Sequence, residues 1–89
     1  MVKVQDLSEE RHIERELVLI NVNCAAKNRG EILELVDIFR ARILDVFHKG
    51  LIVEIADDRD RIADFIELLR PYGIREIIRT GRIAIARGI

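Results

Sequence analysis

The sequence has little cysteine, proline or glycine, and it has no long apolar run. A single cysteine among 89 residues excludes an internal disulfide framework, which suits a reducing compartment, so we expect a cytoplasmic protein. One proline and five glycines leave room for uninterrupted helices and strands. No apolar stretch approaches the roughly 20 residues that span a bilayer, and no signal peptide is visible, so we expect no membrane partner.

An excess of charge of either sign is also missing. Fifteen Lys+Arg face sixteen Asp+Glu, and the formal net charge is −1. Acids and bases alternate along the chain without a basic stripe, so we expect no nucleic-acid partner. What is present is 49% apolar and 35% charged residues, the composition of one folded domain. A domain of this size buries only roughly 60% of its unfolded surface, which favours association with a partner.

Residues that carry catalysis are scarce too. The two histidines are His12 and His48, and no P-loop and no nucleophile–base pair is recognisable. Cys24 and His48 are expected at the same end of a sheet, but two ligands are too few for a metal site. We therefore expect no catalytic, cofactor-binding or metal-binding residues, and no enzyme. A metal-responsive domain built on this pair remains an alternative.

Hydrophobic periodicity predicts the elements. Apolar residues recur at helical spacing in two stretches 30 residues apart, with strand-like runs on either side of each. The order strand-helix-strand-strand-helix-strand is typical of a ferredoxin-like α+β sandwich, with a four-stranded antiparallel sheet and two helices on one face. The predicted strands are residues 16–24, 42–47, 51–56 and 74–80 with 82–87, and the helical faces are 32/35/36/39 and 62/65/66/69.

Local signals mark where these elements begin and end. Asn28 followed by Glu31 has the form of a helix-capping box, and Asp57 is a second candidate N-cap. Gly50 closes a three-residue hairpin loop, where we expect it in the left-handed conformation. Gly81 is expected to break or bulge the last strand. The charged residues 8–15 are expected to form a connector.

The first strong strand raises the question of a partner. Residues 17–20 are apolar without a break, so both faces of the strand are apolar. Val18 and Ile20 can face the two helices. Leu17 and Leu19 then lie on the uncovered face, where Ile52 of a neighbouring strand joins them. An apolar patch on an open sheet face indicates a dimer or domain interface.

One loop is a candidate for binding a ligand. The segment "CAAKNRGEI" contains Lys27, Asn28, Arg29 and Gly30 just before the first helix. Backbone N–H groups at a helix N-terminus attract carboxylates, and glycine allows close approach to the backbone. An ordinary capped helix start is the favoured interpretation of the same residues, because capping alone accounts for Asn28 and Glu31. The alternative function that follows is an ACT-like sensor of a small molecule such as an amino acid.

Three stretches together resemble a known family. "HIERELVLINVNC", "EILELVDIFRARILDV" and "IREIIRTGRIAIARG" are similar to the C-terminal half of the small, regulatory subunit of acetolactate (acetohydroxyacid) synthase. The resemblance implies that residues 1–12 are the remnant of a preceding ACT-domain strand and linker, and that residues 13–89 are a ferredoxin-like regulatory domain. The family's valine-binding residues belong chiefly to the ACT half, so none is carried over to this sequence.

The resemblance also implies a function. It implies a non-catalytic regulatory subunit that binds the catalytic subunit of acetolactate synthase, raises its activity and makes it sensitive to feedback inhibition by valine. The pathway is branched-chain amino-acid biosynthesis. Thiamine diphosphate, magnesium and flavin would belong to the catalytic partner, and we expect a homodimer of this chain.

Overall fold

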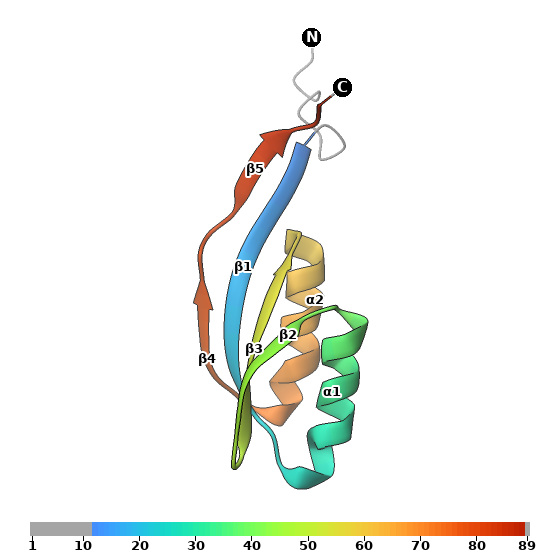
Figure 1. Ribbon diagram of the computed structural model, residues 1–89, viewed down its shortest axis with the longest axis vertical. Coiled ribbons are helices and arrows are strands. Elements are labelled where there is room, and N and C mark those ends of the chain that lie inside the picture. Colours follow the sequence, from blue (N-terminus) through green and yellow to red (C-terminus); the bar gives the residue numbers. More distant parts are fainter. Residues whose placement is uncertain (1–11, 89) are drawn as a thin grey trace.

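A computed structural model describes residues 12–88, which form two helices and one five-stranded antiparallel sheet. Figure 1 shows both helices on the same side of the sheet. The elements in chain order are β1 (His12–Asn23), η3 (Ala26–Asn28), α1 (Arg29–Ile38), β2 (Arg42–Phe47), β3 (Gly50–Asp57), α2 (Arg59–Leu69), η4 (Arg70–Tyr72), β4 (Ile74–Arg79) and β5 (Ile83–Ala86).

The strands pair in the order β2-β3-β1-β4, so β1 is central. The predicted α+β class, with two helices over an antiparallel sheet, is confirmed. The sheet has five strands where four were expected, because β5 pairs with the first residues of β1, from His12↔Ala86 to Arg15↔Ile83. Residues 12–15 are therefore strand, and the prediction of a connector there is wrong. Residues 1–11, which include most of the expected ACT remnant, lie outside the described residues.

The core lies between the sheet and the helices. Alternate residues of β1 and β3 face inward, and one stripe of each helix meets them, as the periodicity predicted. Phe39 and Phe65 pack together with their ring centroids 5.2 Å apart. The buried apolar residues are Val18, Ile20, Val22, Cys24, Ile32, Val36, Phe39, Leu51, Val53, Ile55, Ile62, Phe65, Ile66 and Leu69.

Both predicted helix caps need correction. No side-chain hydrogen bond caps α1 at Asn28, because the chain enters this helix through the 3-10 turn η3. Glu31 instead accepts a hydrogen bond from the hydroxyl of Tyr72 at 2.7 Å. The N-cap of α2 is Asp58, one residue after the predicted Asp57, and its carboxylate accepts from the backbone N–H of Arg61. The acidic residues do cap α2, but one position later.

The glycines play different roles. The hairpin between β2 and β3 is present, but the predicted left-handed conformation of Gly50 is wrong. The only glycines with positive φ in residues 12–88 are Gly73 and Gly81. Gly50 is the first residue of β3, and a Cβ there would lie 2.7 Å from Cε2 of Phe47, so close packing explains it. Gly81, with φ of 91°, separates β4 from β5 as the sequence predicted.

Candidate docking surface

The predicted interface residues lie together on the sheet face that the helices leave open. Leu17 and Leu19 alternate with the buried residues of β1, and Ile52 pairs with Asn21 on the same face. All three apolar side chains are half-buried. Ile78 joins them from β4 because it pairs with Leu19, and it is 54% exposed. We call this surface, made of Leu17, Leu19, Ile52 and Ile78 around Asn21, the outer face.

The sequence alone does not single out Ile78, because Ile77 and Ile78 are adjacent and either could point outward. The register decides between them, since Ile77 pairs with the buried Ile20 and packs against the core. The only signal that could have found Ile78 is this pairing, which depends on residues almost 60 positions away in the chain.

Strand β5 extends the apolar surface beyond the helices. It forms a two-stranded ribbon with residues 12–15, and in Figure 1 this ribbon rises above the start of α2. Ile13 pairs with Ile85, and Ile83 lies one step along the same face. All three side chains are exposed. The alternation of Ile83 and Ile85 with alanine was visible in the sequence, but their partner strand was not.

An ion pair links β1 to the end of β4 beside the start of the ribbon. The Glu16 side chain, only 5% exposed, accepts from Nε of Arg79 at 3.1 Å and from Nη2 at 2.8 Å. These hydrogen bonds hold the pKa of the Glu16 carboxyl below its ordinary value of 4.5, and they raise the pKa of Arg79. At the next residue, the backbone N–H of Thr80 donates to the carbonyl oxygen of Leu17. The Thr80 hydroxyl accepts from the backbone N–H of Leu17 and lies within donating distance of the same carbonyl oxygen.

A polar side chain interrupts the outer face at its centre. Asn21 is half-buried between Ile52 on β3 and Glu76 on β4. Its Oδ1 atom is buried and accepts no hydrogen bond from the described residues. A buried acceptor without a donor costs about 1–3 kcal/mol, so the amide is an incomplete feature of this face.

One edge of the sheet carries features that disfavour pairing with another chain. Strand β2 is this edge, at the opposite side of the sheet from β4, and its pairing with β3 shifts register between Ile43 and Asp45. The Asp45 carboxylate also accepts from the backbone N–H of Val46 at 3.0 Å. Bulges and inserted charges are the devices by which edge strands avoid pairing with another chain. Pairing of another chain along β2 is therefore disfavoured.

The predicted ligand loop lies at the opposite end of the molecule from the ribbon, between β1 and α1 (Figure 1). Lys27 and Gly30 are exposed, while Asn28 and Arg29 are half-buried. A Cβ on Gly30 would meet nothing within 4 Å. Nε of Arg29 is buried without a hydrogen-bond partner among the described residues. The loop thus brings an open surface and one unpaired donor together.

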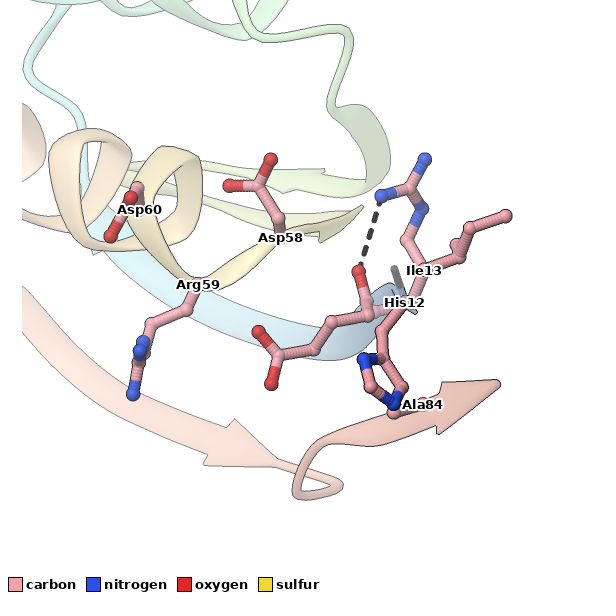
Figure 2. Close-up of a pocket in the computed structure, with 8 residues that line it drawn as sticks. His12, Ile13, Asp58, Arg59, Asp60 and Ala84 are labelled. Carbon is pink, nitrogen blue, oxygen red and sulfur yellow. Dashed lines mark hydrogen bonds between the residues drawn. The ribbon is translucent and has the colours of Figure 1, made fainter. Parts of the chain in front are cut away.

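A pocket that the sequence did not predict lies between the ribbon and the first turn of α2. Figure 2 shows His12 and Ala84 on the ribbon side and Asp58, Arg59 and Asp60 on the helix side. Its volume is about 570 Å³, within the range of small-molecule sites. The Asp58 carboxylate is already engaged as the N-cap of α2, and the lining carries charges of both signs without a set that selects one ligand.

Cys24 and His48, the two residues considered as metal ligands, differ in their exposure. Cys24 is fully buried, and its Sγ lies 3.8 Å from the carbonyl oxygen of Ala25. His48 is exposed in the β2–β3 hairpin. Within residues 12–88, no group of three or more metal-ligating side chains gathers. Over the same part of the chain, neither helix has the length and apolar character needed to cross a bilayer.

Comparison with known proteins identifies relatives. The family model described as the small subunit of acetolactate synthase matches residues 15–88. A probable acetolactate synthase small subunit of Archaeoglobus fulgidus is 48% identical over 87 residues, which cover 98% of this chain and 54% of the relative. The acetolactate synthase small subunit of Bacillus subtilis is 42% identical over 88 residues, covering 99% and 51% of the two chains.

A solved structure agrees with these sequences. The crystal structure of the acetolactate synthase small subunit from Thermotoga maritima superimposes with a TM-score of 0.86 at 40% identity. The match covers 92% of this chain and 50% of that one. The chain therefore spans about half the length of these three relatives.

Proposed function

Because the chain belongs to the family of acetolactate synthase small subunits, where it corresponds to their C-terminal domain, we propose that it is a non-catalytic regulatory domain. It acts by binding other protein surfaces. The match of residues 15–88 to the family model is the observation that carries this proposal.

The principal partner in this proposal is the catalytic subunit of acetolactate synthase, in the cytoplasm. The domain supports activation of that subunit and its feedback inhibition by valine, in branched-chain amino-acid biosynthesis. Thiamine diphosphate, magnesium and flavin then belong to the catalytic subunit. The names of the relatives, which are all small subunits of this enzyme, support the assignment.

We propose that the domain docks on its partners through the outer face. A homodimer of this chain is one of the complexes that we propose for this face. Leaving one leucine or isoleucine exposed forgoes about 1.5–3 kcal/mol of burial. The outer face places four apolar residues side by side, the exposed Ile78 and the half-buried Leu17, Leu19 and Ile52, so part of this burial is still available to a partner.

We also propose a specific fold for the main part of the chain. Strands β1 to β4 with both helices form a ferredoxin-like unit, which the strand order β2-β3-β1-β4 supports.

Reconstitution tests the function. The purified chain is added to the purified catalytic subunit, and acetolactate formation is measured with and without valine. We expect a raised rate, and we expect the double variant Leu17→Asp/Leu19→Asp to lose most of that increase. The matched control is Glu34→Ala/Glu67→Ala, which changes one exposed residue on each helix. A rate that the wild-type chain leaves unchanged, without detectable binding to the catalytic subunit, would contradict the proposal.

A small-molecule sensor at residues 27–30 is the second candidate function. The unpaired Nε of Arg29 and the open space at Gly30 are the observations in its favour, although the relatives' names do not point to it. Calorimetric titration of valine, with leucine as control, separates the two candidates. Saturable heat that is lost in Gly30→Val supports the sensor. The absence of heat leaves the chain acting through its surfaces.

A further inference from the structure

We propose that Arg40, just after α1, anchors this chain to an acidic side chain on the surface of the catalytic subunit. The carboxylate of that side chain enters the pocket that Ile38, Arg40, Asp57 and Arg61 line, and it binds the guanidinium groups of both arginines. This contact rests on the proposed function, which supplies the partner. It lies on the helix side of the sheet, away from the outer face.

Arg40 has a backbone conformation that usually belongs to glycine. Its φ is 57°, and within residues 12–88 it is the only non-glycine residue with positive φ. The backbone N–H of Arg40 donates to the carbonyl oxygen of Asp37, and that of Ala41 donates to the carbonyl oxygen of Val36. These two bonds form the Schellman motif that ends many helices, and its left-handed position favours glycine because a Cβ is disfavoured there. An arginine at this position therefore makes the fold less stable than a glycine would.

No contact of the Arg40 side chain explains this conformation. The residue is exposed, and its guanidinium makes no hydrogen bond or ion pair with the residues that the structure describes. The helix dipole favours a positive charge at this end of α1, but the effect is small for an exposed side chain in salt. A side chain that the fold does not use, held in a disfavoured backbone conformation, indicates a role in binding.

Arg61 of α2 lines the same pocket and is already held in place. Its Nε donates to Oδ2 of Asp57 at 3.0 Å, and its Nη2 donates to the carbonyl oxygen of Ile38 at 3.3 Å. The guanidinium also lies over the Phe39 ring, 4.8 Å from the ring centroid. These contacts leave Nη1 for another acceptor. They also fix the group before binding, so less side-chain entropy is lost when an anion arrives.

The pocket lies where the end of α1 meets the start of α2, at the upper end of the helix pair in Figure 1. Its volume is about 380 Å³. The described lining carries two arginines and one aspartate, and Asp57 is paired with Arg61. One positive charge therefore remains. A planar guanidinium matches a carboxylate, which it can bind through two parallel hydrogen bonds.

Ile38 favours a carboxylate that belongs to a protein. This side chain lines the pocket and is 60% exposed. A free carboxylate ion in the pocket would leave the isoleucine in water. A protein surface that inserts an acidic side chain covers the isoleucine at the same time, and this burial adds to the affinity. Arginine is enriched among the few residues that dominate binding at protein interfaces.

Arg40→Gly separates the fold from the contact. We expect this variant to melt about 2–6 °C above wild type, because glycine relieves the left-handed conformation. We also expect it to bind the purified catalytic subunit at least tenfold more weakly, as measured by isothermal titration calorimetry. Arg40→Lys keeps the charge without the two-pronged geometry and should bind with intermediate affinity. Lys49→Ala removes an exposed positive charge from the β2–β3 hairpin, so it is the matched control and should bind like wild type.

A zero-length cross-link tests whether the partner group is acidic. A carbodiimide couples a lysine amine to a carboxylate, whereas it does not couple an arginine guanidinium. In Arg40→Lys, residue 40 should therefore be joined to an aspartate or glutamate of the catalytic subunit, which mass spectrometry of tryptic peptides locates. Wild type is the blank at this position. Products from Lys27 and Lys49 give the background of the method.

The contrary outcomes can be told apart. If wild type binds the catalytic subunit and Arg40→Gly binds equally well, the anchor is overturned while the proposed function stands. If Arg40→Gly melts below wild type, the fold itself requires the arginine and the inference is overturned. Saturable binding of acetate by wild type, or a change in self-association alone, would assign the pocket to a free carboxylate or to a second copy and would also overturn it. If wild type does not bind the catalytic subunit, the proposed function fails together with the anchor.

Discussion

Glu16 and Arg79 are 63 residues apart in the chain, and their side chains form a two-pronged ion pair, with Nη2 of Arg79 2.8 Å from Oε1 of Glu16. The pair stands where β4 ends and the chain turns toward β5. It links β1 to β4, next to the point where the backbone N–H of Thr80 donates to the carbonyl oxygen of Leu17. The pair therefore fixes the end of β4 against β1, just before the chain continues into β5.

The ion pair predicts an acid-sensitive stability. The pKa of Glu16 is lower in the folded chain than its ordinary 4.5. The stability that this carboxylate contributes is thus fully present above pH 4.5 and is lost as the pH falls through the lower, folded pKa. Arg79→Met should cost about 1–3 kcal/mol at pH 7, because it leaves a buried carboxylate without its two guanidinium donors. Urea unfolding of both chains at pH 7 and pH 3 should show the difference shrinking in acid, and an equal difference at both pH values would contradict this.

The two helix starts predict unequal effects of cap removal. Asp58→Ala removes the carboxylate that accepts from Arg61 N–H and should lower the unfolding free energy by about 0.5–2 kcal/mol. Asn28→Ala removes a side chain that makes no capping hydrogen bond, so we expect a smaller loss. Thermal unfolding of the two variants under one set of conditions measures the contrast. Equal losses would show that Asn28 does cap α1.

Two glycines predict opposite responses to alanine. Gly73 has φ of 99°, and a Cβ there would lie 2.5 Å from Nδ2 of Asn23. Gly73→Ala should therefore destabilise the fold by about 1–3 kcal/mol. Gly30 lies in α1 with open space around a Cβ, so Gly30→Ala should stabilise it by about 0.4–1 kcal/mol. Chemical denaturation of both variants tests the signs, and destabilisation by Gly30→Ala would be the contrary result.

Neighbouring isoleucines on β4 predict a separation of folding from docking. Ile77 packs against the core, whereas Ile78 is on the outer face. Ile77→Ser should lower the unfolding free energy by about 1–3 kcal/mol, through lost burial and a poorly placed hydroxyl. Ile78→Ser should leave the stability of the monomer within about 0.5 kcal/mol of wild type and should weaken association instead. Unfolding at a concentration that keeps the chain monomeric, beside ultracentrifugation at high concentration, separates the two effects.

Local patterns made much of the fold predictable. The helical stripes at 32/35/36/39 and 62/65/66/69 do face the core, because a 3.6-residue period is a property of the sequence alone. The hydrophobic run at residues 17–20 likewise indicated a strand with two apolar faces, and Leu17 and Leu19 do lie on the face that points away from the helices. The caps were predicted less well, since Asp57 and Asp58 offer the same chemistry and only the geometry of the turn selects one.

The sequence by itself determined the α+β class, the two helical faces and the apolar character of the outer face, because each depends on residues a few positions apart. Only the tertiary structure decided that β5 pairs with residues 12–15, that Ile78 rather than Ile77 points outward, and that Asn21 keeps an unpaired oxygen at the centre of that face. These features depend on the register between strands far apart in the chain, and a shift of one residue would reverse every one of those faces.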